Sequence, residues 1–221
     1  MNYNEIIQAV AVYALPVIFA ITLHEAAHAY AAKYFGDLTA YAQGRMSLNP
    51  IKHIDPLGTI VIPLVVLAMS QGQFFFGYAK PVPVNYSALR NPRKQMAYVA
   101  LAGPASNFAM AFGWMVLGLL MIGAGVSEPF PLKVAQAGIN ANLLFFALNM
   151  LPIPPLDGGR IMTSILPPRY GNKFAMIEPY GFVILIALML THSLGYLIAP
   201  FHIAAGFALD MLATPITIFL N

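Results

Sequence analysis

Two histidines and a glutamate are spaced so that the histidines can bind a metal ion and the glutamate can act on a water beside it. The segment His24-Glu25-Ala26-Ala27-His28 fits the pattern H-E-x-x-H. Residues four apart on an α-helix lie about 40° apart around the axis and about 6 Å apart along it, so both imidazoles can reach one zinc ion. The glutamate then lies beside that ion, where it can hold and deprotonate a water. The alternative is a hydrogen-bonded cluster that only ties helices together.

A catalytic zinc requires three protein ligands and one open position. The chain has no cysteine, so the third ligand must be a histidine or a carboxylate. Asp157 is favoured because it directly follows a hydrophobic run, in the proline- and glycine-rich stretch 149–159, where free backbone groups and close approach are both available. The other candidates are set aside as loop, terminal or opposite-face residues: Glu5, Asp37, His53, Asp55, Glu128, His192, His202 and Asp210.

The composition places this chemistry in a membrane. Of the 221 residues, 59% are hydrophobic and 9% are charged, whereas soluble domains are about 45–50% apolar and about 25% charged. Disorder is excluded by the same numbers. We therefore expect a multi-pass integral membrane protein that has the lipid bilayer as its surroundings. The net charge of +3 then reflects basic loops on one membrane face, and no nucleic-acid partner is expected.

The pattern of hydrophobic stretches predicts an all-α polytopic membrane protein with about five transmembrane helices. A shorter stretch, 57–76, reads as re-entrant or interfacial, and gives a sixth span if it crosses. Prolines and asparagines after it predict a small re-entrant or β-hairpin element between the first and second core helices. We expect a single domain, 1–221, with a catalytic core at about 6–165 and C-terminal helices at about 179–221. The expected spans are 6–35, 96–125, 134–151, 179–198 and 201–220, the last two around a bend at Pro200.

The positions of the basic residues predict the topology. If 57–76 enters and leaves on one side, all of the 11 Lys and Arg residues except Lys133 fall on one face. The positive-inside rule makes that face cytoplasmic. The catalytic residues then lie toward the cytoplasmic side of the plasma (inner) membrane, and the N-terminus lies outside. In this topology Asp157 reaches the same membrane face as the two histidines.

Three motifs together resemble the site-2 protease family of intramembrane zinc metalloproteases (peptidase family M50). They are the HEAAH helix, the stretch AGPASNF at 102–108 and the stretch NMLPIPPLDGG at 149–159. The resemblance covers roughly residues 15–165 and is greatest to compact members without a PDZ domain. Within the second motif, Gly103-Pro104 is typical of a helix start, and an alternative is that it shapes the wall of the active site.

The resemblance also implies roles for individual residues. It implies that His24, His28 and Asp157 are zinc ligands and that Glu25 is the general base. Asn149 matches a family position that binds the substrate backbone or the oxyanion. From its own position alone, Asn149 could equally be a helix-terminal hydrogen-bonding residue.

A proline-rich segment offers a place for an extended substrate. Pro81 and Pro83 recur with period two, so one side of a strand lacks N–H donors while Val82 and Val84 donate on the other. Such an edge can accept a transmembrane protein substrate by strand addition near residues 80–85. The alternative is a proline-rich connector that has no partner.

These features predict a zinc-dependent intramembrane endopeptidase that hydrolyses peptide bonds within or near the transmembrane segments of other proteins. The alternative is a polytopic metal-ion transporter or channel that uses the same His/Glu/Asp cluster. A transporter would predict internal repeats, or polar groups strung across the membrane. The sequence shows no repeat, and its polar groups are expected at one depth.

Overall fold

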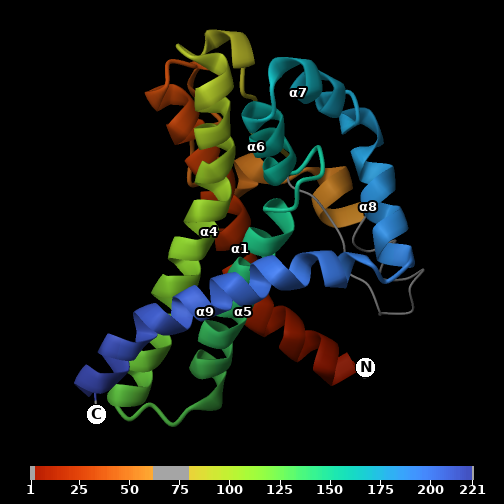
Figure 1. Cartoon of the computed structure of the whole chain (residues 1–221). Helices are drawn as coiled ribbons and strands as arrows, with labels where there is room; N and C mark the ends of the chain where they lie inside the picture. The colour runs from red at the N-terminus through yellow and green to blue at the C-terminus, as the bar shows by residue number, and fades with distance from the viewer. Residues whose placement is uncertain (1–2, 62–79, 221) are drawn as a thin grey trace.

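The computed structural model describes residues 3–61 and 80–220, and within these ranges every regular element is a helix (Figure 1). Two long helices, α1 (Tyr3–Tyr34) and α4 (Pro92–Gly123), have 32 residues each. A third, α5 (Pro129–Asn149), packs against both of them. The all-α prediction is confirmed for the described residues. The strand-and-turn stretch expected after residue 76 is described from residue 80 on, where it contains one short 3-10 helix, Tyr86–Ala88, and no strand, so the predicted hairpin is not confirmed.

Short helices join and extend this three-helix core. The chain between α1 and α4 includes α2 (Thr39–Ala42), η1 (Pro50–His53), η2 (Pro56–Val61) and η3 (Tyr86–Ala88). After α5 come α6 (Asp157–Ile165) and α7 (Pro168–Ala175), η4 (Glu178–Tyr180), α8 (Gly181–Leu190) and α9 (Leu194–Leu220). The C-terminal end of α1, the N-terminal end of α4, and α6 and α7 gather at one end of the molecule, the upper end in Figure 1.

Prolines lie at the starts of helices and also inside them. Pro92 and Pro129 occupy the first helical positions of α4 and α5, where a missing N–H costs nothing. Pro104 lies within α4 and is buried, so the prediction of a helix start at Gly103-Pro104 is wrong. A membrane helix tolerates an internal proline because neighbouring helices and side chains satisfy the freed carbonyl.

Among residues 3–61 and 80–220, four helical runs are long and apolar enough to cross a membrane. This confirms a membrane-type helical fold; the predicted count of five spans remains a prediction. Helix α5 coincides with the expected span 134–151 but is not among the four. Of the stretch 57–76, only the part up to Val61 is described, and it is helical. The four runs are Ile7–Tyr34, Pro92–Gly123, Pro168–Leu190 (α7, η4 and α8 together) and Leu194–Ile218.

The C-terminal bend lies earlier than the sequence predicts. Helix α9 runs through Pro200 without ending, and α8 and α9 are separated instead at residues 191–193. His192 there has a φ of 56°, in the left-handed region. The prediction of a bend at Pro200 is wrong because a proline removes only one hydrogen bond of a helix, whereas a left-handed residue redirects the chain.

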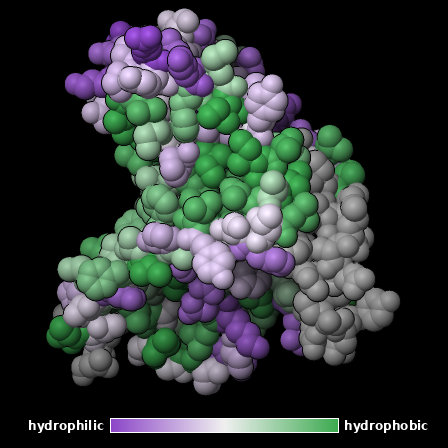
Figure 2. Space-filling view, turned by 45° about the vertical axis from the view of Figure 1, so that its right-hand side comes forward, coloured by the Kyte–Doolittle hydropathy of each residue, from purple (hydrophilic) through white to green (hydrophobic). Residues whose placement is uncertain are grey.

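Small residues let the helices of the core approach closely. The main apolar cluster joins α4, α5 and α9. Alanines at these contacts bring backbones together, which is the usual basis of helix packing in lipid. On the face shown in Figure 2, apolar side chains cover the middle, and hydrophilic side chains gather over the upper end and again in a second group below the middle. The buried members of the cluster are Ala111, Met115, Leu143, Ala205 and Leu209.

Candidate metal centre

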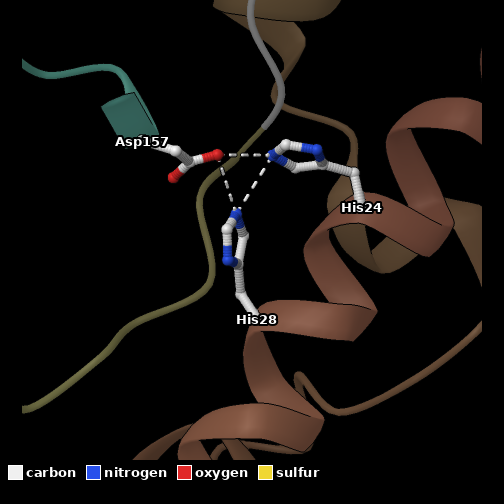
Figure 3. A group of neighbouring side chains, drawn as sticks. All are labelled: His24, His28 and Asp157. Atoms are coloured by element: carbon white, nitrogen blue, oxygen red, sulfur yellow. Dashed lines mark hydrogen bonds and ion pairs between the residues drawn. The ribbon is translucent and has the colours of Figure 1, made fainter. Parts of the chain in front are cut away.

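Three side chains from two helices meet at one buried point (Figure 3). His24 and His28 lie on successive turns of α1, and Asp157 is the first residue of α6. The Nε2 atoms of the two histidines are 3.0 Å apart. The Oδ2 atom of Asp157 lies 3.2 Å from Nε2 of His24 and 3.3 Å from Nε2 of His28. Within residues 3–61 and 80–220, no other group of His, Cys, Asp or Glu side chains is close enough to share a metal ion.

These distances fit a tetrahedral metal site. Ligand atoms bound about 2.0–2.1 Å from a tetrahedral zinc lie about 3.3 Å from one another. The Oδ2 atom of Asp157 is buried and has no hydrogen-bond partner among the described residues. A buried carboxylate oxygen without a partner is costly, and an ion at the centre of the three atoms supplies the missing interaction.

Both imidazoles direct their second nitrogen away from this centre. Nδ1 of His28 lies 2.8 Å from the carbonyl oxygen of Val99, which can only accept a hydrogen bond. Nδ1 of His24 lies 2.6 Å from Oδ1 of Asn107. In the neutral imidazole the proton is therefore on Nδ1, and Nε2 keeps its lone pair. Two lone pairs and a carboxylate facing one another form a set of metal ligands, with the hydrogen-bonded outer partners that such ligands normally have.

A tight turn places Asp157 at the centre. A β-carbon on Gly158 would overlap the carbonyl groups of Met150 and Leu151, and one on Gly159 would overlap the backbone at Ile153. Only glycine fits at these two positions, so the Asp-Gly-Gly sequence folds α6 back against the end of α5. The turn therefore presents the Asp157 carboxylate, an oxygen ligand that zinc accepts, to the two imidazoles.

Gly103 lets α4 pass directly against the two imidazoles. A β-carbon at this position would overlap Nε2 and Cε1 of His28 and also Cε1 of His24. The alternative reading of Gly103-Pro104, that it shapes the wall of the active site, agrees with this contact.

Glu25 lies beside the three potential ligands, at the edge of a cavity of about 120 Å³. Its Oε2 atom accepts a hydrogen bond of 2.7 Å from the main-chain N–H of Val82. Residues 80–85, which we call the covering segment, contribute Pro81, Val82 and Val84 to the lining of this cavity. Val82 is buried against Ala29 of α1 and Ala40 of α2.

Comparison with known proteins gives the family. YwhC of Bacillus subtilis, which is named as a zinc metalloprotease, is 40% identical over 191 residues, covering 84% of this chain and 83% of YwhC. The chain belongs to this family of zinc metalloproteases. Rip2 of Mycolicibacterium smegmatis, named in the same way, is 31% identical over 178 residues, or 80% of this chain and 66% of Rip2. Rip2 of Mycobacterium tuberculosis is 29% identical over 181 residues.

No family model matches the chain, and no solved structure matches it. The membership of this zinc metalloprotease family therefore rests on the sequence relatives. Together with the helices apolar enough to span a bilayer, it makes the protein a membrane metalloprotease whose metal is zinc. The cluster of His24, His28 and Asp157 is the place in the described structure that could bind this metal.

Asn149 lines the same cavity in this zinc metalloprotease, at the last turn of α5. Its Nδ2 atom donates to the carbonyl oxygen of Phe145, 3.1 Å away on the same helix. The residue thus makes the helix-terminal hydrogen bond that its position alone predicts. It also lines the cavity beside the three potential ligands, and the substrate role that the family resemblance implies stays a prediction. A primary amide has two N–H donors, so the second remains for another acceptor.

The covering segment is held by residues to which the sequence analysis gave no such role. Asp37, treated there as a solvated loop acid, is fully buried. Its Oδ2 accepts the N–H of Asn85 at 2.6 Å, and its Oδ1 accepts the N–H of Thr39 at 2.9 Å. At the other end, Nη2 of Arg45 donates to the carbonyl oxygen of Lys80 at 2.8 Å. An acid two residues before a short helix is a signal for such a capping role, but its burial depends on tertiary contacts.

Proposed function

We propose that this metalloprotease is an intramembrane endopeptidase of the site-2 protease type, which hydrolyses peptide bonds within or near the membrane spans of other proteins. The observation that carries the proposal is the position of His24 and His28. Both lie within Ile7–Tyr34, a run apolar enough to cross a bilayer. Ionisable groups inside such a run are costly and usually mark a functional site.

Each residue of the centre has a role in this proposal. His24, His28 and Asp157 hold the zinc ion. Bound zinc lowers the pKa of a water and polarises the substrate carbonyl. Glu25 takes the proton of that water and later delivers it to the leaving amine. Glu25 is adjacent to His24 on α1 and lines the same cavity as the three proposed ligands, which supports this assignment.

We place the substrate along the covering segment. Pro81 and Pro83 have no N–H, so Val82 is the main-chain donor among these three residues, and its N–H points to Glu25. An extended substrate strand that pairs here brings a carbonyl to the Val82 N–H in place of the Glu25 carboxylate. Docking then frees Glu25 to bind water. The described residues 80–85 form no strand before this pairing.

Asn149 completes the substrate site in this proposal. Asn149 lines the cavity, and the second N–H of its side-chain amide is the donor that we assign to a substrate carbonyl or to the oxyanion that develops during attack. The hydrogen bond to Phe145 holds the amide in a fixed orientation, so that little reorganisation is needed.

We also propose that the centre opens toward the cytoplasmic side of the plasma (inner) membrane. The upper end of the molecule in Figure 1, where α1 ends and α4 begins and where α6 and α7 lie, is the end near most of the Lys and Arg positions of the sequence. The positive-inside rule makes such an end cytoplasmic.

The test uses purified protein in liposomes with two model transmembrane peptides. One has an uninterrupted apolar helix, and the other carries a Gly-Pro pair at its centre that lets the backbone extend. The proposal predicts zinc-dependent cleavage of the second peptide within its span and much slower cleavage of the first, because hydrogen-bonded helix carbonyls are shielded. Cleavage restricted to soluble peptides would contradict it. Zinc flux across the liposomes without cleavage would support the transporter alternative instead.

A further inference from the structure

We infer that Asn107, held by Asn142, is a positioning residue that fixes the proton of His24 on Nδ1 and so presents Nε2 to the metal. This inference rests on the proposed role of His24 as a zinc ligand. It adds two residues to which no role has so far been assigned.

Both asparagines lie where an unpaired amide would be very unfavourable. Asn107 is in the middle of α4 and Asn142 is in the middle of α5, and both are fully buried. Burying an amide without hydrogen bonds is costly in apolar surroundings. Both amides accordingly have hydrogen-bond partners: Asn107 bonds to His24, Ala20 and Asn142, and Asn142 also bonds to Gly138.

The orientation of each amide follows from an acceptor that cannot donate. The carbonyl oxygen of Gly138 accepts from Nδ2 of Asn142 at 2.8 Å, so Oδ1 of Asn142 faces the other way. Nδ2 of Asn107 then donates to that Oδ1 at 3.1 Å. It also donates to the carbonyl oxygen of Ala20, again at 3.1 Å.

These two donated bonds leave only one arrangement at His24. With its Nδ2 directed at two acceptors, Asn107 must turn Oδ1 toward Nδ1 of His24, and the two atoms are 2.6 Å apart. An amide oxygen can only accept, so Nδ1 of His24 carries the proton and Nε2 carries the lone pair. The carbonyl of Gly138 on α5 thus determines the tautomer of a metal ligand on α1, through two asparagine side chains.

The two histidines differ in this respect. Nδ1 of His28 donates to the main-chain carbonyl of Val99, which no substitution removes. Nδ1 of His24 depends on a side chain, so its tautomer and ring orientation can be changed by replacing Asn107. Removing such an outer partner typically lowers metal affinity 10–100-fold.

Two substitutions at position 107 separate positioning from structural support. N107L removes both the acceptor to His24 and the donors to Ala20 and Asn142. N107D keeps the acceptor but loses the donors. If the oxygen acceptor of residue 107 positions His24, zinc binding weakens only when that acceptor is lost. Thermal stability falls whenever the hydrogen bonds donated to Ala20 and Asn142 are lost.

The experiment measures the zinc dissociation constant of the purified full chain by competition with a chromophoric chelator. It also records the visible spectrum of the Co²⁺-substituted protein and the thermal unfolding of the metal-free protein. N107L is expected to weaken zinc binding 10–100-fold and to change the Co²⁺ spectrum. N107D is expected to bind zinc within about threefold of wild type, although both variants unfold at lower temperature. Wild-type affinity in N107L, or equal losses of affinity in both variants, would overturn the inference.

H24A is measured in parallel so that two kinds of failure can be told apart. If H24A binds zinc like wild type, the proposed ligand set is wrong. If H24A loses affinity and N107L does not, only the role of Asn107 is wrong. Nitrogen-15 NMR of histidine-labelled, metal-free wild type gives a readout that needs no variant. The inference predicts the Nδ1–H tautomer at His24, and an Nε2–H tautomer there would contradict it.

Discussion

The main-chain N–H of Val82 donates a 2.7 Å hydrogen bond to Oε2 of Glu25, between residues 57 positions apart in the chain. The proposed general base and the proposed substrate edge are therefore in direct contact. The hydrogen bond has to break before Glu25 can hold a water and before a substrate carbonyl can pair with Val82. Docking of the substrate and release of Glu25 therefore occur together, because the substrate carbonyl replaces the Glu25 carboxylate at the Val82 N–H.

Replacing Val82 by proline tests this contact. V82P removes the N–H donor, and we expect peptide cleavage to fall about tenfold or more, since a hydrogen bond to a charged or reacting group is worth about 1.5–3 kcal/mol. Zinc content should stay at wild-type level because the metal cluster is untouched. The matched control is V82A, which loses the buried side chain but keeps the N–H. If V82A lost as much cleavage as V82P, packing of residue 82 and not its N–H would matter.

Replacing Gly103 by alanine tests the contact of α4 with the metal centre. The added β-carbon overlaps both imidazoles, so we expect G103A to bind zinc at least tenfold more weakly than wild type. Gly113, on the same helix, has open space where a β-carbon would be added. G113A should therefore retain zinc and unfold at or slightly above the wild-type temperature, because alanine is the better helix former. Equal zinc affinity in both variants would argue against this contact.

Replacing Asp37 by asparagine tests the anchor of the covering segment. One carboxylate oxygen is then exchanged for an NH₂ group that faces a main-chain N–H, in a fully buried position. An unsatisfied buried donor costs about 1–3 kcal/mol, so the thermal midpoint should fall. Limited proteolysis should also cut faster between residues 80 and 91. The control is E128Q at an exposed position between α4 and α5, where neither measurement should change.

Removal of zinc should affect stability as well as activity. The three ligand atoms lie within 4.8 Å of one another, and without a cation their lone pairs repel. We expect a chelator to abolish peptide cleavage and to lower the thermal midpoint, and Zn²⁺ or Co²⁺ to restore both. A ligand present at 1,000 times its dissociation constant stabilises a protein by about 4 kcal/mol. The zinc requirement would be contradicted if protein with less than about 0.1 zinc per chain still cleaved at the wild-type rate.

Local spacing predicted most of the metal centre. His24 and His28 are four residues apart on one helix, so helical geometry alone brings them together. Asp157 was predicted from its proline- and glycine-rich surroundings and from the number of membrane crossings before it, and the structure brings it to the same point. These predictions depend on short segments and on whether the number of membrane crossings between them is odd or even. Both can be taken from the sequence directly.

Other features depend on contacts that no local pattern shows. The burial of Asp37 and the pairing of Val82 with Glu25 each join segments about 50 residues apart. Pro200 was predicted to bend the chain, but the surrounding helix accommodates it. Asn107 could have been found, because an asparagine within an otherwise apolar span is costly unless it serves a purpose. Which group it serves follows only from the packing of α1, α4 and α5.

The substitution E25Q tests the central claim most directly. It keeps the size of the side chain and leaves the three proposed ligands in place, but it removes the carboxylate that takes the proton from water. The measurement is the zinc content of purified E25Q together with its rate of cleavage of the Gly-Pro transmembrane peptide. We predict one zinc per chain, as in wild type, and cleavage reduced at least 100-fold, in line with the usual contribution of a general base. Full zinc content with cleavage at the wild-type rate would contradict the mechanism.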